Sequence, residues 1–220
     1  MCGRFAQTRT EKEKLLKRFR LKKIVDDLKP RFNIAPGQSV PVILNEHPDE
    51  LVRARWGLVP FWAKDEKIGF KMINARAETI GEKPAFRKPI KSQRCLIIAD
   101  GFYEWQKRDD GKHPHYIHRA DGEPFAMAGI WDTWKNEEKE LLTCSIITTG
   151  PNTVMEGIHH RMPVILSEEA EQQWLSDIPV HEARRLLNPC PPEWLEAYEI
   201  STLVNSPAND TPAVIEPVTS

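Results

Sequence analysis

The sequence predicts an α+β fold, in which one domain is built around a mostly antiparallel β-sheet with helices at its flanks. Three observations favour this class. Between residues 94 and 149, apolar runs rich in β-branched and aromatic residues alternate with short turn signals. Helical periodicity is confined to segments near residues 10–21 and 167–187. No repeat, low-complexity block or linker-like stretch divides residues 1–205, so we expect a single unit.

The first predicted helix lies in the segment TRTEKEKLLKRF. Thr10 is followed three residues later by Glu13, which is the pattern of a capping box. Leu15, Leu16 and Phe19 then recur at helical spacing. We therefore expect an amphipathic helix that opens at Thr10.

A hairpin is predicted in the segment SVPVILNEHPDELVRARW. Val40, Val42 and Leu44 alternate with other residues, as in a strand with one buried face. The polar stretch that follows predicts a turn around Pro48.

A meander of strands is predicted to follow, beginning with RCLIIADGFYEWQ. Asp-Gly pairs at 110–111 and 121–122 mark turns around the strand HPHYIHRA. The segments PFAMAGIWDTW, LLTCSIITT and MPVIL then have the composition of buried strands. SEEAEQQWL and VHEARRLL predict two helices. Residues 1–205 are therefore assigned to the domain, and the Pro-rich residues 206–220 to a tail that wraps loosely or is disordered.

Composition places the chain among globular proteins without membrane spans. It has 220 residues, of which 40% are hydrophobic and 29% charged. No stretch has the eighteen apolar residues of a membrane span, and charged residues interrupt the N-terminus, which excludes a signal peptide. The four cysteines lie far apart without a C-x-x-C pair, which indicates reduced thiols. We expect a cytoplasmic protein, associated with the nucleoid when it acts on DNA.

Charge is distributed unevenly along the chain. The net charge is −1, which argues against a generally basic nucleic-acid binder. Basic residues nevertheless exceed acidic ones in residues 1–120, and acidic ones dominate residues 121–220. The segment FRKPIKSQR is especially basic. A basic face that follows a phosphate backbone is therefore expected.

Cys2 is the first candidate for chemistry, because the chain opens MCGRFAQT. Removal of the initiator Met before this small residue would leave a thiol and a free α-amine on adjacent carbons. The α-amine has a pKa of about 7.7–8.0 and is partly neutral near neutral pH. Such a 1,2-aminothiol condenses with aldehydes to a thiazolidine ring.

Two segments carry candidate proton-transfer groups. Glu104 lies between aromatic residues in FYEW, where apolar surroundings raise the pKa of a carboxyl group. His159, His160 and Arg161 precede an apolar strand in GIHHRMPVIL, and imidazole is an acid–base group near neutral pH. Taken alone, FYEW favours an exposed glutamate on a half-solvated face, and either histidine could be an ordinary polar loop residue.

The segment NARAET places Asn74, Arg76 and Glu78 at every second position. In an extended chain these side chains project to one side. Asn74 could then orient an electrophile while Arg76 holds an anion; a capped helix start is the structural alternative.

Aromatic and histidine clusters are further candidates for base stacking and metal binding. Trp56, Phe61 and Trp62 in RWGLVPFW could stack on nucleobases or lie in the core. The three histidines between 113 and 118 lack a Cys or carboxylate at metal-site spacing. We expect no metal site.

Six short motifs, taken in order, resemble those of the SRAP family of SOS response-associated peptidases and abasic-site processing proteins. The motifs are MCGRF, RFNIAP, WGLVPFW, NARAET, ADGFYEW and HHRMPVIL, and the resemblance runs from residue 2 to about residue 210. It implies a single α+β domain with a twisted, partly barrel-like sheet. It also implies binding of abasic sites in single-stranded DNA and their covalent capture.

The resemblance assigns a role to each candidate residue. Cys2 is expected to be the nucleophile, with Asn74 and Glu104 beside it. His159 is expected to be the acid–base group, because the functional histidine of the H-x-R-M-P pattern stands two residues before the arginine. The resemblance also implies that DNA is contacted by Arg4, Arg76, Arg161, Trp62 and Trp105.

The implied activity is that of a suicidal or self-reversing crosslinking protein with lyase-like Schiff-base chemistry and removal of its own Met1. The alternatives are an N-terminal-nucleophile peptidase and a noncovalent reader of modified or single-stranded DNA. We expect a monomer that needs no cofactor; the sequence identifies no protein partner.

Overall fold

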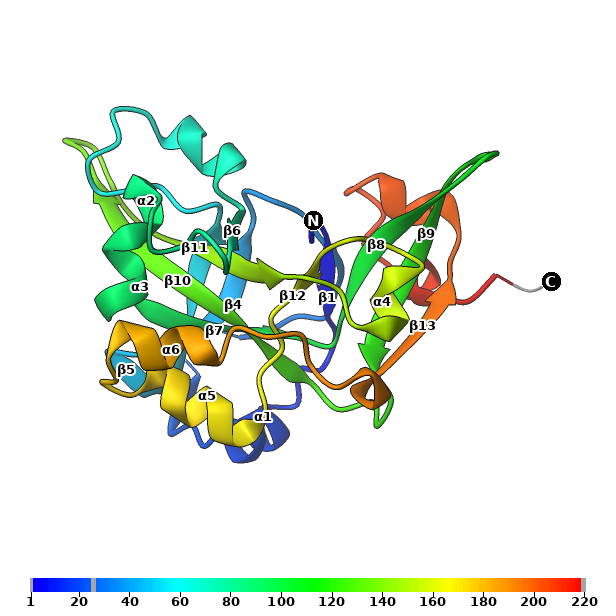
Figure 1. Ribbon diagram of the computed structural model, residues 1–220, viewed down its shortest axis with the longest axis horizontal. Coiled ribbons are helices and arrows are strands. Elements are labelled where there is room, and N and C mark those ends of the chain that lie inside the picture. The colour runs from blue at the N-terminus through cyan, green and yellow to red at the C-terminus, as the bar shows by residue number, and fades with distance from the viewer. Residues whose placement is uncertain (1, 25–26, 219–220) are drawn as a thin grey trace.

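The computed structural model describes residues 2–24 and 27–218 and contains two adjoining sheets (Figure 1). The strands are β1 (Phe5–Gln7), β2 (Lys23–Ile24), β3 (Arg31–Ile34), β4 (Ser39–Leu44), β5 (His47–Trp56), β6 (Asn74–Arg76), β7 (Arg94–Ala99), β8 (Gly101–Arg108), β9 (Gly111–Arg119), β10 (Phe125–Lys135), β11 (Glu140–Thr149), β12 (Met162–Pro163) and β13 (Leu195–Glu199). The α-helices are α1 (Lys12–Arg18), α2 (Pro84–Arg87), α3 (Pro89–Ser92), α4 (Thr153–Glu156), α5 (Glu168–Leu175) and α6 (Val180–Arg185). Four 3-10 helices are η1 (Glu66–Lys71), η2 (Pro192–Trp194), η3 (Thr202–Asn205) and η4 (Pro212–Ile215) among the described residues.

The larger sheet closes into a barrel. Its strands follow the order β12-β11-β10-β7-β4-β5-β2, and β6 joins it by pairing with β11. β11 also pairs with β5 in parallel, with Thr143 opposite Arg55 and Cys144 opposite Trp56. This pairing closes the ring formed by β11, β10, β7, β4 and β5. The expected α+β domain with a mostly antiparallel, partly barrel-like sheet is therefore confirmed.

The smaller sheet has five strands in the order β13-β9-β8-β1-β3. Asp100 alone separates β7 of the barrel from β8 of this sheet, so one stretch of chain contributes to both. Phe5 of β1 packs edge-on against Trp56 of β5, with ring centroids 5.1 Å apart. Both side chains are fully buried. The N-terminal strand is thereby fixed between the two sheets.

Helices α5 and α6 cover the outside of the barrel near β7 (Figure 1). Trp174 of α5 is buried, and its indole N–H donates to the Cys95 carbonyl at 3.0 Å. The Arg94 guanidinium is also buried and donates to the Trp174 carbonyl at 2.8 Å. Arg94 therefore belongs to the interior and does not extend the basic surface that FRKPIKSQR predicted.

Two of the three predicted turns differ in accuracy. The hairpin of β4 and β5 is confirmed, but Leu44 pairs with His47, so the turn lies at residues 45–46 and precedes Pro48. The Asp-Gly turn between β8 and β9 is confirmed, with Arg108 opposite Gly111. Gly111 has a φ of 139°, a conformation that residues with a side chain rarely adopt.

The N-terminal helix differs from the prediction at its first turn. α1 begins at Lys12, its N-cap is Glu11, and no side chain caps it. The expected capping box at Thr10 is therefore wrong. By contrast, the helix predicted in SEEAEQQWL is confirmed as α5, and Ser167 caps it by accepting from the Ala170 N–H at 3.2 Å.

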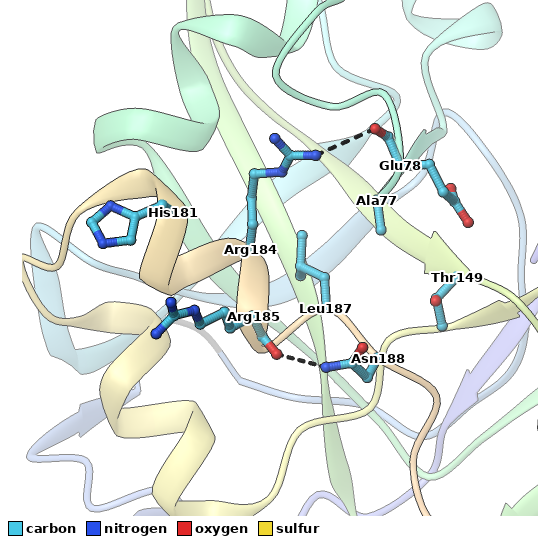
Figure 2. A pocket seen from close by; sticks show the side chains of 8 residues that line it. All are labelled: Ala77, Glu78, Thr149, His181, Arg184, Arg185, Leu187 and Asn188. Carbon is cyan, nitrogen blue, oxygen red and sulfur yellow. Dashed lines mark hydrogen bonds between the residues drawn. The ribbon is translucent and has the colours of Figure 1, made fainter.

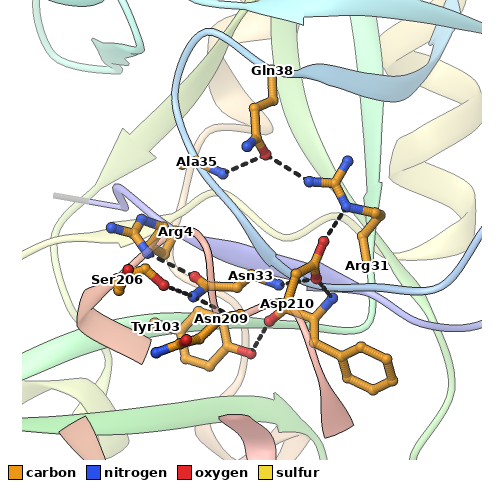
Figure 3. A network of polar contacts seen from close by, with 10 residues as sticks. Arg4, Arg31, Asn33, Ala35, Gln38, Tyr103, Ser206, Asn209 and Asp210 are labelled. Carbon is orange, nitrogen blue, oxygen red and sulfur yellow. Dashed lines mark hydrogen bonds and ion pairs between the residues drawn. The ribbon is translucent and has the colours of Figure 1, made fainter. Parts of the chain in front are cut away.

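The segment after residue 205 is bound to the domain as far as residue 218 (Figure 3). The Asp210 carboxylate forms an ion pair with Arg31 and accepts from the Asn33 backbone N–H at 3.0 Å. The Asn33 side-chain amide donates to the Asn209 carbonyl at 2.8 Å. Val214 is fully buried. The expectation of a loose or disordered tail is therefore wrong for the residues that the structure describes.

We predict that Asp210→Ala lowers the free energy of unfolding by about 1–3 kcal/mol, because it leaves the Arg31 guanidinium and two backbone donors without their acceptor. Urea denaturation followed by tryptophan fluorescence measures the change. Glu216→Ala, in an exposed position of the same segment, is the control and should change stability by less than about 0.5 kcal/mol. Equal stability of the two variants would contradict the anchoring role.

Candidate active site

Cys2 lies three residues before β1 and is fully buried. Its sulfur contacts the Arg4 carbonyl oxygen at 3.8 Å. Burial raises the pKa of the Cys2 thiol far above its ordinary value, and the negative charge of Glu104 raises it further. In this environment the sulfur is a neutral thiol.

Asn74 reaches Cys2 from the barrel. β6 pairs in parallel with β11, placing Asn74 opposite Ile146, and the Trp56 indole N–H holds the preceding Ile73 carbonyl at 2.9 Å. The Asn74 amide N–H then donates to the Cys2 carbonyl at 2.8 Å. Its side-chain oxygen is buried and accepts no hydrogen bond within the part of the chain that the structure describes. That oxygen can accept a hydrogen bond from a ligand.

Glu104 reaches the same place from the smaller sheet. β1 pairs antiparallel with β8, and the Tyr103 N–H donates to the Arg4 carbonyl at 3.0 Å. The next residue along β8, Glu104, therefore lies near the start of β1. Its side chain is buried, and burial raises the pKa of the Glu104 carboxyl to about 7. Both protonation states are accessible near neutral pH.

His159 contributes the third polar group. It follows α4, where Asn152 caps the helix and the His159 N–H donates to the Met155 carbonyl at 2.8 Å. The ring nitrogen Nδ1 lies 3.8 Å from Glu104 Oε1. Burial lowers the pKa of His159, which keeps the ring largely neutral near pH 7. His160 is exposed and stacks on His159 with ring centroids 4.3 Å apart.

Two pockets open beside these groups. The Asn74 pocket has a volume of about 370 Å³ and is lined by Trp62, Lys71, Met72, Asn74, Arg76, Thr79, Lys83, Pro84, Ala85 and Phe86. The Glu104 pocket has a volume of about 510 Å³ and is lined by Glu104, Trp105, Lys107, Lys112, Glu156, Gly157, Ile158, His159 and His160. Each combines an aromatic side chain with basic residues beside a site residue. Together they offer two basic approaches to one buried polar centre.

The expected DNA-contacting residues divide into two groups. Arg76 is exposed and lines the Asn74 pocket with Trp62, which is 50% exposed. Trp105 lines the Glu104 pocket, and its indole N–H donates to the Asn205 side chain at 2.8 Å. These three side chains border the pockets.

Arg4 and Arg161 are instead bonded inside the protein, which the sequence did not indicate. The Arg4 guanidinium donates to the Asn33 side chain at 2.7 Å and to the Val204 carbonyl at 2.8 Å (Figure 3). The Arg161 guanidinium binds both carboxylate oxygens of Glu78, at 2.6 Å and 3.0 Å. This pairing lowers the pKa of Glu78.

Glu78 is separated from the other polar residues of its segment. β6 ends at Arg76, so the extended geometry expected for NARAET does not continue to Glu78. Glu78 lines a third pocket, of about 440 Å³, with Ala77, Thr149, His181, Arg184, Arg185, Leu187 and Asn188 (Figure 2). The expectation that Asn74, Arg76 and Glu78 share one side is therefore wrong for Glu78.

The other sequence candidates lie elsewhere. Trp56 is fully buried in the core, whereas Phe61 is exposed. His113 bonds to Glu199 at 2.7 Å and to Asp110 at 2.9 Å. Within residues 2–24 and 27–218, no group of three His, Cys, Asp or Glu side chains is arranged to hold a metal ion. No helix in the described ranges is long and apolar enough to cross a membrane.

Comparisons with known proteins identify the family. The sequence model of the family described as SOS response associated peptidase (SRAP) matches residues 1–207. The chain is 46% identical over 223 residues to abasic site processing protein YoqW of Bacillus subtilis (strain 168), covering 98% of this chain and 99% of the relative. It is 37% identical over 226 residues to abasic site processing protein HMCES of Gallus gallus, covering 86% of this chain and 67% of the relative.

Solved structures agree with this result. A crystal structure of a protein from Bacteroides thetaiotaomicron superposes with a TM-score of 0.87 at 34% identity, covering 98% of this chain and 100% of that one. A crystal structure from Bordetella bronchiseptica gives a TM-score of 0.80 at 27% identity, with 91% and 100% covered. The buried N-terminal cysteine, the fold and the matched residues lead to one conclusion: the chain belongs to the SRAP family.

Proposed function

We propose that this chain processes abasic sites by capturing the ring-opened sugar covalently at Cys2. The observation that carries the proposal is the convergence of three groups from separate elements on one buried residue. Asn74 bonds the Cys2 carbonyl, the charge of Glu104 acts on the Cys2 thiol, and His159 lies beside Glu104. The relatives named abasic site processing proteins support the same substrate.

The order of bond formation follows from the state of each nucleophile. The buried thiol is protonated, so the α-amine of Cys2, once Met1 is removed, attacks first. The amine adds to C1′ of the aldehyde, and loss of water leaves a Schiff base. The thiol then adds across the C=N bond, its proton passing to nitrogen, and closes the thiazolidine. C1′ is then bound to both nitrogen and sulfur, and no aldehyde remains to promote strand cleavage by β-elimination.

The proton transfers and hydrogen bonds of this reaction are assigned to Glu104, His159 and Asn74. His159 transfers the proton needed to open the closed hemiacetal form of the sugar. A protonated Glu104 donates to the departing hydroxyl as water leaves, which suits a carboxyl group of pKa about 7. The buried oxygen of Asn74 accepts a hydrogen bond from the ring nitrogen or from a hydroxyl of the opened sugar.

The two pockets beside the site fit a single strand of DNA. Arg76 would bind a phosphate at the Asn74 pocket, and Trp62 and Trp105 would stack on bases. Base–aromatic stacking contributes about 1–3 kcal/mol per base and does not depend on sequence. A missing base would open the path to C1′. All these residues come from one chain, so the proposal requires only a monomer.

Removal of residue 1 by the same site is a second candidate activity, favoured by the family description as a peptidase. The Cys2 thiol would attack the carbonyl of residue 1, and water would release the resulting thioester. The raised pKa of the Cys2 thiol leaves little thiolate for either attack. Self-removal needs only one event at an adjacent carbonyl, whereas cleavage of peptides in trans would need repeated turnover at a buried thiol. Mass spectrometry of freshly translated Cys2→Ala protein tests self-removal, in the absence of methionine aminopeptidase.

An uncleavable residue or tag ahead of Cys2 should abolish the stable adduct, because it turns the α-amine into an amide that cannot form an imine. The comparison is with a protein that begins at Cys2, as confirmed by mass spectrometry. Both are incubated with an abasic single-stranded oligonucleotide and separated on a denaturing gel. Equal adduct yields would contradict the proposed mechanism, and absence of any adduct would favour a noncovalent reader.

Cys2→Ala should remove the stable adduct while retaining most of the noncovalent affinity, since phosphate contacts and stacking do not use the thiol. After removal of Met1 both Cys2→Ala and Cys2→Ser keep the α-amine, so each should still form a Schiff base that borohydride traps. Fluorescence anisotropy measures binding and a denaturing gel measures the adduct. A stable adduct formed by Cys2→Ala without reductant would refute the nucleophile assignment.

The crosslinking rate should pass through a maximum near neutral pH. It rises as the α-amine loses its proton, with a pKa of about 7.7–8.0, and falls as Glu104 ionises above about 7. Glu104→Gln should slow crosslinking roughly 100-fold and remove the falling limb. Rates measured at saturating DNA between about pH 5 and 9 decide this; an unchanged profile in Glu104→Gln would exclude Glu104 as the acid.

A further inference from the structure

The main chain of Arg161 offers two hydrogen-bond partners to Nδ1 of His159. The Arg161 N–H and the Arg161 carbonyl oxygen both lie 3.1 Å from His159 Nδ1. When Nδ1 carries no proton, the N–H can donate to it; when Nδ1 is protonated, the carbonyl can accept from it. One peptide segment therefore provides a partner for either protonation state, as a group that gives and takes protons requires.

The Arg161 side chain determines where this segment lies. Its guanidinium is fixed by two hydrogen bonds to the Glu78 carboxylate and by one to the Thr148 carbonyl at 2.6 Å. Arg161 is only 9% exposed. Bidentate pairing of arginine with a carboxylate restricts both position and orientation. Movement of the guanidinium would move the peptide groups that hold His159.

The main chain of Glu78 is held in place, while its side chain is 53% exposed. The preceding Ala77 N–H donates to the Thr148 carbonyl at 2.9 Å, which continues the pairing of β6 with β11. Arg184 donates to the Glu78 main-chain carbonyl at 3.4 Å. Figure 2 shows that the Glu78 carboxylate is directed away from Arg184. The carboxylate is thus left to Arg161.

We propose that Glu78 is a positioning residue for His159, acting through the side chain and main chain of Arg161. Asn74 and Glu78 then have matched tasks, because one short segment orients Cys2 with its first residue and His159 with its fifth. The expected effect of Glu78 on the crosslinking rate rests on the proposed function. It also gives Arg161 an internal task, distinct from the phosphate contact that its sequence motif implied.

The test compares Glu78→Ala and Glu78→Gln with the wild-type protein. Glu78→Ala should lower the maximal crosslinking rate at saturating abasic DNA by roughly 10- to 100-fold, the effect of a small displacement of a reacting group. Glu78→Gln keeps the shape and one acceptor oxygen, so it should lose less. The dissociation constant for abasic DNA is measured with each substitution on a Cys2→Ala background. It should change less than about threefold, because Glu78 acts on the position of His159 and not on the DNA contacts.

The matched control is Glu171→Gln. Glu171 binds Arg18 through both carboxylate oxygens, at 2.9 Å and 2.8 Å, in a pair between α5 and α1. This variant should lose stability while its crosslinking rate stays at the wild-type value. It separates a general loss of stability from displacement of His159.

A spectroscopic measurement gives a result that does not depend on crosslinking. The ¹⁵N chemical shift of His159 Nδ1, recorded by NMR without DNA, should change in Glu78→Ala and lie closer to wild type in Glu78→Gln. If Glu78→Ala fails to fold, the His159 shift and the crosslinking rate of Glu78→Gln are compared with those of Glu171→Gln instead. If the wild-type protein forms no adduct, the proposed function fails, and the His159 shift alone decides the inference. An unchanged His159 shift, or a loss confined to DNA affinity, would overturn the positioning role.

Discussion

Strand β11 forms hydrogen bonds with four other strands, and the placement of the candidate site depends on these pairings. Along its length it meets β10, β5, β6 and β12. The β5 pairing closes the barrel, and the β6 pairing brings Asn74 to Cys2. Thr148 of the same strand holds Arg161. One strand therefore connects the two sides of the polar centre, which explains how residues far apart in sequence share a small volume.

The titratable side chains of the candidate site favour their neutral forms in the absence of substrate. Burial raises the pKa of Cys2 and Glu104 and lowers the pKa of His159, so each group is shifted towards its neutral form. Charges lie at the rims instead, on residues such as Arg76 and Lys107. This separation suits a reaction in which a polyanion is held outside while a small neutral carbonyl enters.

Local patterns in the sequence predicted most of the strands but not their closure. Alternation and turn chemistry identified the β4–β5 and β8–β9 hairpins, because both signals lie within a few residues. The parallel pairing of β5 with β11 joins Arg55 to Thr143, and no local pattern encodes such a contact. The capping box failed for a related reason, since Thr10 and Glu13 are a local match that the chain entering α1 does not use.

The residues of the candidate site could be predicted from the sequence where short motifs indicated them. The segments containing Cys2, Asn74, Glu104 and His159 were identified in advance, and the structure brings their residues together. These motifs do not indicate which arginines form ion pairs inside the protein. Arg161 and Glu78 are separated by 83 residues, and only the fold makes them partners. The run of apolar residues between 212 and 215 was the one signal that could have revealed the bound C-terminal segment.

The hydrogen bonds between Arg4 and the carbonyl oxygens of Val204 and Asn205 have a consequence for biosynthesis. Arg4 leaves the ribosome early, but its partners are made some 200 residues later. At about 5–20 residues per second, this interval lasts roughly 10–40 s. Throughout that time the Arg4 guanidinium lacks its two C-terminal acceptors, although its Asn33 acceptor is made early. The N-terminal segment therefore acquires its full set of contacts only when nearly the whole chain has been made.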